Sequence, residues 1–218
     1  MKTTTIFYLI AIILTVNSCK KNVPHLLNIT LQPGTSNGKD AEIFSCVQCG
    51  YNNQNFGASK ELSAIAWTNG GAVSNARGLI EFDLSAIPAK SLINNAKLSL
   101  YYNPTSTNGN DTALIGTNAC LLKRITENWT RETVTWDNQP QTTEINKVIL
   151  PQSTTSNQNY LDINVTALVA DMINNPTQSF GFMLKLETEE FYRRLIFASS
   201  DNPDLTLHPK LEITYTSK

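Results

Sequence analysis

The chain has 218 residues, of which 41% are hydrophobic and 16% are charged, and its formal net charge is −1. Soluble domains carry about 25% charged residues; here Asn, Thr and Ser replace part of them, which suits an exported protein. The low net charge and the absence of an arginine-rich run argue against nucleic acid as a partner and against general binding of polyanions.

The first residues have the features of a secretory signal. Lys2 is followed by an apolar run, Ile6 to Val16, that is shorter than a membrane-spanning helix, which needs about 20 residues. The run closes on Val-Asn-Ser-Cys, which resembles a bacterial lipobox ending at Cys19. We therefore expect a signal peptide over residues 1–18, an acylated Cys19 as membrane anchor, and a tether over residues 19–26. The alternative is an ordinary cleaved signal in which Cys19 is incidental.

The residue after the lipobox indicates where the anchor is inserted. Lys20 lacks the acidic character that is associated with retention of lipoproteins in the inner membrane of Gram-negative bacteria. We expect the protein to be lipid-anchored in the outer membrane of the cell envelope, with one extracellular domain over residues 27–218. A chain of this length can bury a sizeable core.

Three further cysteines, Cys46, Cys49 and Cys120, lie within that domain. The Cys-Val-Gln-Cys pair lacks the second pair that a structural zinc site needs. A redox motif of this spacing opens a helix, whereas here the turn-forming stretch 50–53 (Gly-Tyr-Asn-Asn) follows. We expect one disulfide among the three cysteines in an oxidising compartment, and the sequence leaves the pairing open.

Short β-type runs alternate with turn clusters along the rest of the chain. The stretch 78–84 places Ile80, Phe82 and Leu84 on one face of a strand. The same signal recurs at 96–102, 119–125, 147–150, 160–165, 180–186, 194–198 and 211–215. Asn-Pro and Asn-Gly pairs between the runs favour turns.

One helix interrupts this pattern. Over Thr166–Asn174 the apolar residues Leu168, Val169, Met172 and Ile173 share a face, and Thr166 is a candidate N-cap. Many short strands with a single helix predict an all-β fold, an antiparallel β-sandwich of the jelly-roll type.

Several stretches together resemble the DNRLRE domain, which is grouped with family 96 carbohydrate-binding modules. They are Leu31–Gly34 with Gly38–Ala41, Arg77–Pro88, Glu127–Glu132, Thr133–Pro140, Asp162–Thr166, Phe180–Lys185, and Ser199–Asp201 with His208–Leu211. Two features depart from the family. The eponymous stretch has only an approximate counterpart, at residues 192–195, and the Cys46/Cys49 loop is not a family feature.

The resemblance implies an extracellular jelly roll that binds polysaccharide without catalysis. Some relatives bind uronate-rich polysaccharide such as alginate, but a ligand does not transfer with a fold. The alternative is a surface adhesin or structural scaffold without a glycan ligand, which would have a protein partner in the envelope.

Three tryptophans are candidates for stacking on sugar rings. Trp136 belongs to the family signature and lies in an alternating run, so we expect it in the core. Trp129 follows Asn128 in a turn and would keep part of its ring exposed, and Trp67 lies outside the signature. Trp67 and Trp129 are therefore the stacking candidates, of which Trp67 is the better one, although packing is the favoured role for Trp67.

Five basic residues lie on or beside strands: Arg77, Lys123, Arg124, Arg193 and Arg194. If strand alternation sets several of them on one face, guanidinium forks would bind uronate carboxylates bidentately. We favour this charge-based mode over stacking. The alternative is scattered surface charge.

Individual acids have competing interpretations. Asp40 or Asp83 would be a structural partner of Arg77. Jelly-roll modules often hold calcium, to which Asp40 and Asp201 would contribute, but no ligand spacing here is diagnostic, and we expect no cofactor.

Enzyme motifs are missing: neither a Gly-x-Ser-x-Gly, a His-Glu-x-x-His nor a phosphate-binding glycine loop is present. A glycosidase needs only two carboxylates, but the acidic cluster Glu187, Glu189 and Glu190 is typical of a solvated turn. A lyase built on Tyr192 beside the arginines is a weaker alternative. We expect the protein not to be an enzyme.

Overall fold

The computed structural model describes residues 25–217. The expected signal peptide, Cys19 and all but the last two residues of the tether lie outside the described residues. Within them, no helix is long and apolar enough to cross a membrane.

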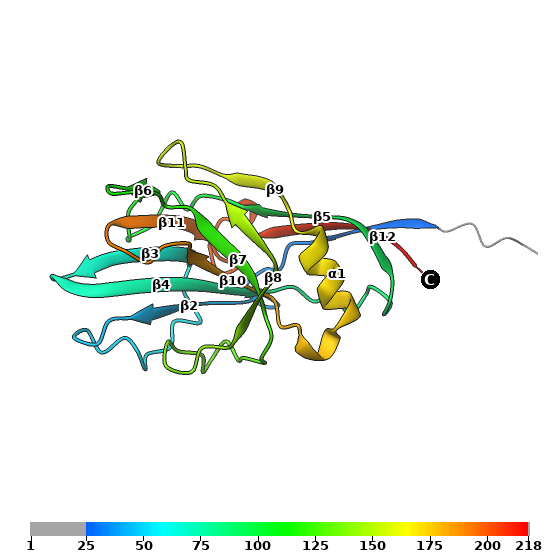
Figure 1. Ribbon diagram of the computed structural model, residues 1–218, viewed down its shortest axis with the longest axis horizontal. Coiled ribbons are helices and arrows are strands. Elements are labelled where there is room, and N and C mark those ends of the chain that lie inside the picture. Colours follow the sequence, from blue (N-terminus) through cyan, green and yellow to red (C-terminus); the bar gives the residue numbers. More distant parts are fainter. Residues whose placement is uncertain (1–24, 218) are drawn as a thin grey trace, which may run out of the picture.

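Two antiparallel sheets form a sandwich, as Figure 1 shows. The first sheet has the order β1 (Leu26–Leu31), β12 (Lys210–Thr216), β5 (Leu92–Leu100) and β9 (Tyr160–Asn164). The second has the order β6 (Thr112–Ala113), β11 (Arg193–Ala198), β3 (Glu61–Asn69), β4 (Ala72–Glu81), β10 (Phe182–Leu186), β7 (Cys120–Ile125) and β8 (Thr142–Leu150), with β2 (Lys39–Ser45) paired to β4. The predicted all-β sandwich is confirmed.

The main core lies between the sheets. Alternation directs Leu98 and Leu100 of β5 inward to meet Leu122, Phe182 and Leu184 of the second sheet. The helix α1 (Thr166–Asn174) packs against both sheets and buries the apolar face that its sequence predicts. Apolar burial of this kind is the main force that stabilises a sandwich.

The helix has the predicted bounds but not the predicted cap. The Thr166 hydroxyl accepts a hydrogen bond from the Ala96 amide of β5 at 2.9 Å, so it does not cap its own helix. The Asn164 side chain instead accepts from the Thr166 amide at 3.1 Å. Two short 3₁₀ turns complete the helical elements, η1 (Pro176–Gln178) and η2 (Leu205–Leu207).

The second sheet forks at β4. Strand β2 pairs with residues 75–81 of β4, while β3 pairs with residues 72–76 and β10 with residues 78–80. Since a strand has two edges, β3 and β10 share the edge opposite β2. Gly78 lies at the fork, where a Cβ atom would come within 2.6 Å of the Leu62 side chain. The glycine allows β3 to cross closely over β4.

A second apolar cluster lies on the other face of this sheet, beneath the segment 126–141. Leu79 and Met183 from the strands contact Trp129 and Val134 from the segment. Around residues 78–80 the strand β4 is therefore buried on both faces, with Leu79 in this cluster and Ile80 in the main core. The strands β1, β2, β3 and β6 were not among the predicted runs.

Candidate functional site

A groove of about 430 Å³ lies at the end of the molecule that carries the β3–β4 hairpin. We call it the aromatic groove. Its lining includes the rings of Phe44, Tyr51, Phe56 and Trp67 and the polar side chains of Asn69, Asn108 and Arg194. Figure 1 shows the hairpin at the left, opposite the end where the chain enters β1. Ile65 of β3 and Ser74 of β4 also line it.

One wall consists of three aromatic rings. Phe44 lies on β2, and Tyr51 and Phe56 lie in the loop between β2 and β3. The rings meet edge to face, with centroids 4.8 Å apart for Phe44 and Phe56 and 5.6 Å apart for Tyr51 and Phe56. Such pairs stabilise a fixed arrangement of rings. The wall thus presents apolar carbon to the groove.

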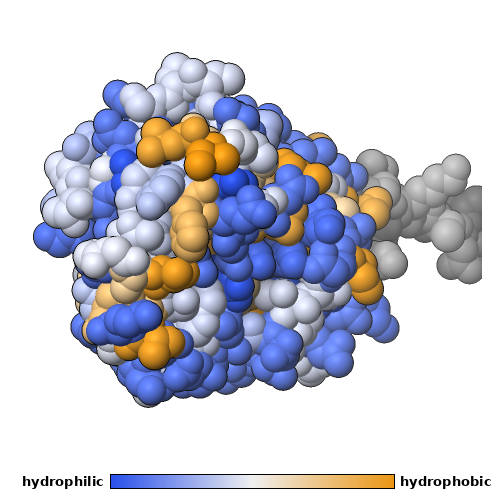
Figure 2. All heavy atoms as spheres, turned by 60° about the vertical axis from the view of Figure 1, so that its left-hand side comes forward, coloured by the Kyte–Doolittle hydropathy of each residue, from blue (hydrophilic) through white to orange (hydrophobic). Residues whose placement is uncertain are grey.

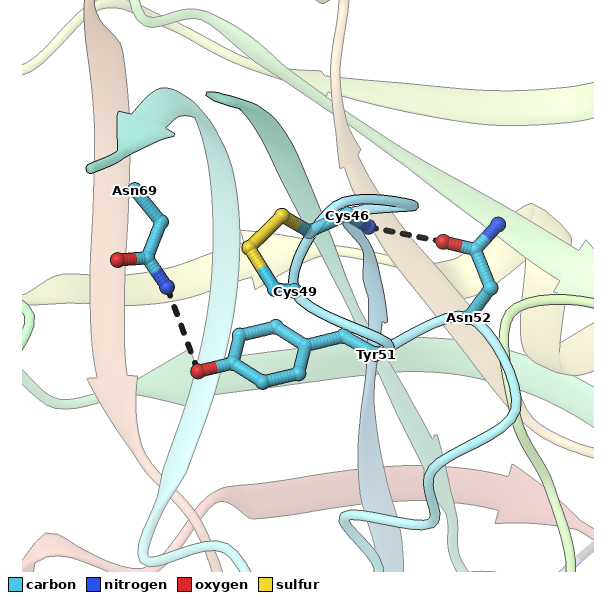
Figure 3. Close-up of a disulfide and its surroundings, with 5 residues drawn as sticks. All are labelled: Cys46, Cys49, Tyr51, Asn52 and Asn69. Carbon is cyan, nitrogen blue, oxygen red and sulfur yellow. Dashed lines mark hydrogen bonds between the residues drawn. A yellow bond between two sulfur atoms is a disulfide. The ribbon is translucent and has the colours of Figure 1, made fainter. Parts of the chain in front are cut away.

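A disulfide anchors this wall at the end of β2. Cys46 and Cys49 are bonded, with their Cα atoms 5.1 Å apart, which settles the pairing that the sequence left open. Figure 3 shows the loop turning from Cys49 into Tyr51, whose hydroxyl accepts a hydrogen bond from Asn69 at 3.3 Å. The remaining thiol, Cys120, is buried, and burial raises its pKa well above the usual value, so it is unreactive.

The opposite wall is built around Trp67 of β3. The guanidinium of Arg194 lies over the Trp67 ring, 4.4 Å from its centroid, and Tyr192 contacts the same ring edge to face at 4.9 Å. Arg194 Nε donates to the Asn110 carbonyl at 2.7 Å. Among the described residues, none accepts a hydrogen bond from the two Nη groups of Arg194, which lie beside Gly109.

The groove also contains a buried carboxyl group. Glu42 of β2 is 1% exposed and accepts hydrogen bonds from Ser59 at 2.5 Å and from Ser63. Burial raises its pKa to about 8, against the effect of the two serines, and the charges of Glu61 and Asp40 add to the rise. Glu42 is therefore mostly uncharged at neutral pH, which leaves Arg194 as the charged group in the groove lining.

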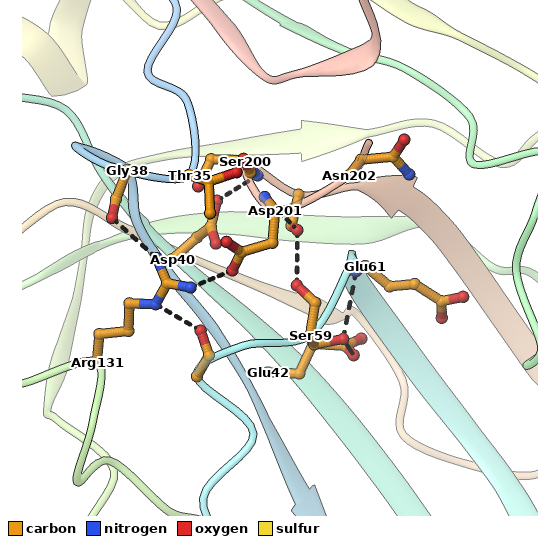
Figure 4. Close-up of polar contacts among 12 residues, drawn as sticks. Thr35, Gly38, Asp40, Glu42, Ser59, Glu61, Arg131, Ser200, Asp201 and Asn202 are labelled. Atoms are coloured by element: carbon orange, nitrogen blue, oxygen red, sulfur yellow. Dashed lines mark hydrogen bonds and ion pairs between the residues drawn. The ribbon is translucent and has the colours of Figure 1, made fainter. Parts of the chain in front are cut away.

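A polar network lies behind Glu42 (Figure 4). Arg131 pairs with Asp201 and donates from Nε to the Gly57 carbonyl at 2.6 Å. Asp40 accepts from the Ser200 amide at 2.7 Å. Both acids that we considered as calcium ligands thus have protein partners, and the part of the chain that the structure describes contains no group of three His, Cys, Asp or Glu side chains that could hold a metal.

The five basic residues do not form one exposed basic face. Arg193 and Arg194 are neighbours on β11, so strand alternation directs them to opposite faces. Arg193 is only 3% exposed. Lys123 and Arg124 on β7 diverge in the same way and are also buried, Lys123 against Glu144 and Arg124 against the Gln178 carbonyl.

Arg77 is fully engaged within the protein. Its Nε and Nη2 atoms each donate to Glu189 at 2.7 Å, Nη1 donates to Gln139 at 2.5 Å, and its guanidinium lies over the Trp136 ring. Burial acts to raise the pKa of Glu189, but the hydrogen bonds and charge of Arg77 lower it below its usual value. The acid paired with Arg77 is therefore Glu189 rather than Asp40 or Asp83, and Glu189 does not belong to a solvated turn.

The tryptophans have different environments. Trp129 is 5% exposed, and its indole N–H donates to the Phe180 carbonyl at 2.9 Å. The expectation that Trp129 remains partly exposed is wrong, because the ring closes the cluster under segment 126–141. Trp136 packs against the same cluster and is partly buried. Of the seven ligand candidates, only Trp67 and Arg194 line the aromatic groove.

The sequence interpretation missed the residues that complete the groove. Tyr51 and Phe56 lie in a loop whose turn-forming residues give no sign of what the rings face. Glu42 is on an unpredicted strand, and Asn108 is on a distant turn, where it donates to Glu61 at 2.8 Å. The one available signal was the recurrence of aromatic residues around the Cys46/Cys49 loop.

The chain matches carbohydrate-binding module family 96 over residues 41–215. The matched range contains every groove residue named above. Among curated proteins, none matches the chain.

Proposed function

The chain belongs to carbohydrate-binding module family 96, and on that premise we propose that the aromatic groove is where it binds carbohydrate. The proposal is carried by one observation: an apolar wall of Tyr51 and Phe56 lies in the same groove as a guanidinium with unused donors. Sugar rings combine an apolar face with polar edges, and this lining offers both kinds of contact.

The polar groups support a uronate-rich glycan. Arg194 is held from behind by Trp67 and Asn110, so its two Nη groups are oriented without loss of side-chain freedom on binding. A planar fork of this kind matches a carboxylate bidentately. The amides of Asn69 and Asn108 add donors and acceptors for hydroxyl groups.

The position of the groove supports a role at the cell surface. The hairpin beside the groove and the entry of the chain into β1 lie at opposite ends of the molecule (Figure 1). A domain tethered through an acylated Cys19 in the outer membrane would present the aromatic groove away from the lipid. Families of carbohydrate-binding modules are generally non-catalytic, and we propose that this chain binds without turnover.

Calorimetric titration with an oligouronate and with a neutral oligoglucan, at low and at high salt, tests the function. We expect the oligouronate to bind and its affinity to fall with salt, since an exposed guanidinium is screened. Trp67→Ala should abolish binding, because the ring supports Arg194 and forms the wall. Reducing-sugar and lyase assays on the same glycans should show no turnover. Absence of binding to any glycan would contradict the proposal.

A protein partner is the second candidate, supported by an apolar patch near the groove. Leu114, Ile115 and Phe191 are exposed, and the Leu114 amide donates to the Tyr192 carbonyl at 3.0 Å, which holds the two segments together. Figure 2 looks onto this end of the molecule and shows apolar side chains among polar ones. Leu114→Ser with Phe191→Ser would abolish capture of an envelope protein but leave glycan binding unchanged.

A further inference from the structure

The Cys46–Cys49 bond contributes little to the core. It joins residues only three apart in sequence, and the loop-closure entropy that a disulfide removes from the unfolded chain is smallest for short loops. The residues that it encloses, Val47 and Gln48, are exposed, Val47 by 79%. Neither packs in the core clusters. Any effect of the disulfide is therefore expected in the neighbouring loop and not in the core.

Locally the bond sets the course of the chain into the groove wall. The Tyr51 amide donates to the Cys46 carbonyl at 3.1 Å, and the Cys46 amide donates to Asn52 Oδ1 at 2.9 Å. The backbone of Tyr51 is thus held beside the crosslinked Cys46. Figure 3 shows the Tyr51 ring extending from this position towards Asn69. Its ring then meets Phe44 and Phe56 edge to face.

The two cysteine residues differ in exposure. Cys46 is 1% exposed, whereas Cys49 is partly exposed, so a reagent reaches the bond from the side of Cys49. A thiolate of an external dithiol attacks Cys49 Sγ, the bond to Cys46 Sγ breaks, and Cys46 takes up a proton. The second thiol of the reagent then attacks the mixed disulfide, which leaves Cys49 reduced and the reagent oxidised by two electrons.

We propose that the Cys46–Cys49 disulfide is a positioning element of the glycan site, which holds Tyr51 in the wall of the aromatic groove. The inference rests on the proposed function of that groove. It predicts that loss of the bond lowers glycan affinity while the sandwich stays folded. A crosslink that only stabilised the fold would lower the melting temperature instead.

The test measures oligouronate affinity and melting temperature of the intact domain before and after treatment with dithiothreitol. We expect affinity to fall roughly three- to tenfold, the contribution of one aromatic contact, and the melting temperature to fall by a few degrees at most. The double variant Cys46→Ser/Cys49→Ser should reproduce the reduced state and no longer respond to dithiothreitol. This control excludes an effect through Cys120.

A double-mutant cycle with Tyr51→Ala identifies the route of the effect. If the bond acts through Tyr51, reduction changes nothing further in that variant. An equal loss of affinity in wild type and Tyr51→Ala would overturn the proposed route, and so would a collapse of the melting temperature on reduction. Unchanged affinity after reduction overturns this inference alone. Failure of the oxidised wild type to bind the oligouronate and a neutral oligoglucan overturns the proposed function as well.

Discussion

Arg193 and Arg194 are adjacent in sequence and have opposite environments. Arg194 lies over Trp67 at the groove, while Arg193 is buried and pairs with Glu190 at 3.2 Å. A peptide step on a strand reverses the direction of the side chain, so two neighbouring arginines cannot serve one surface. Substitution of Arg194 should therefore change ligand affinity, and substitution of Arg193 should change the stability of the fold.

Arg194→Ala should weaken an oligouronate roughly ten- to a hundredfold, the contribution of hydrogen bonds to a charged group. Binding of a neutral glycan and the melting temperature should change little. Arg193→Ala should instead destabilise the domain by about 1–3 kcal/mol through lost packing. Calorimetry and urea unfolding of the two variants make the comparison, with Arg194→Lys as the variant that keeps charge without the fork. Equal oligouronate affinity of wild type and Arg194→Ala would show that Arg194 does not contact the ligand.

Glu42 makes stability depend on pH. Its pKa is about 8 in the folded protein and near the ordinary value of 4.5 when unfolded. Between these values the folded state keeps a proton that the unfolded state has lost. The contribution of Glu42 is thus most favourable below pH 4.5 and is lost as pH rises towards 8.

Glu42→Gln should remove this dependence, because the amide has a similar shape and no charge. We expect wild type to lose stability relative to the variant by up to about 1.4 kcal/mol per pH unit between pH 5 and 8. Urea unfolding across this range measures the difference, in which the contributions of Glu61 and Asp40 largely cancel. Parallel curves for the two proteins would show that Glu42 is ionised throughout.

At the scale of elements, the segment 126–141 acts as a cover for one face of the second sheet. Trp129 anchors it through the Phe180 carbonyl and through burial beside Met183, and Lys39 lies 4.7 Å from the ring centroid. Arg131 adds a second attachment through Asp201. Both motif tryptophans of this segment therefore serve the fold.

Trp129→Ala should destabilise the domain by about 3–5 kcal/mol, as expected for a buried aromatic ring. Glycan affinity of the protein that remains folded should match wild type, since Trp129 does not line the groove. Unfolding and titration under the same conditions test both statements. A loss of affinity at unchanged stability would place Trp129 at the binding surface after all.

At the scale of the whole molecule, the chain enters the sandwich at one end and the β3–β4 hairpin lies at the other. The described chain begins beside the C-terminal strand, where Leu26 pairs with Thr216. The β3–β4 hairpin, which lines the groove, lies at the far end (Figure 1). Anchoring and binding should therefore be independent of each other.

Cys19→Ala should abolish labelling by a palmitate analogue and release the protein from the membrane fraction. The affinity of the domain for an oligouronate should be the same with and without the anchor, because the chain enters β1 at the end of the molecule opposite the β3–β4 hairpin (Figure 1). Unchanged labelling of Cys19→Ala would contradict the lipoprotein assignment, and a change in affinity would contradict the independence of the two ends.

The sequence by itself determined the class of fold. Period-2 alternation predicts strands wherever one face is buried and the other is polar, as in β5 and β12. The helix was predicted with its bounds, because four apolar residues share one face. The sequence pattern did not predict the strands β2 and β3. Both faces of these strands are largely buried, so their apolar and polar residues do not alternate. Family motifs predicted the tryptophans of segment 126–141 as a group but not the burial of Trp129.

The tertiary structure alone decided the site. Alternation says that neighbouring side chains diverge, but only the pairing of strands decides which of the two faces the core, so Arg194 and not Arg193 reaches the groove. The groove itself joins β2, its disulfide loop, β3, β4, a turn near Asn108 and β11. Segments this distant in sequence meet because the sheet forks at Gly78, and no local pattern encodes that approach. The burial that raises the pKa of Glu42 follows from the same long-range packing.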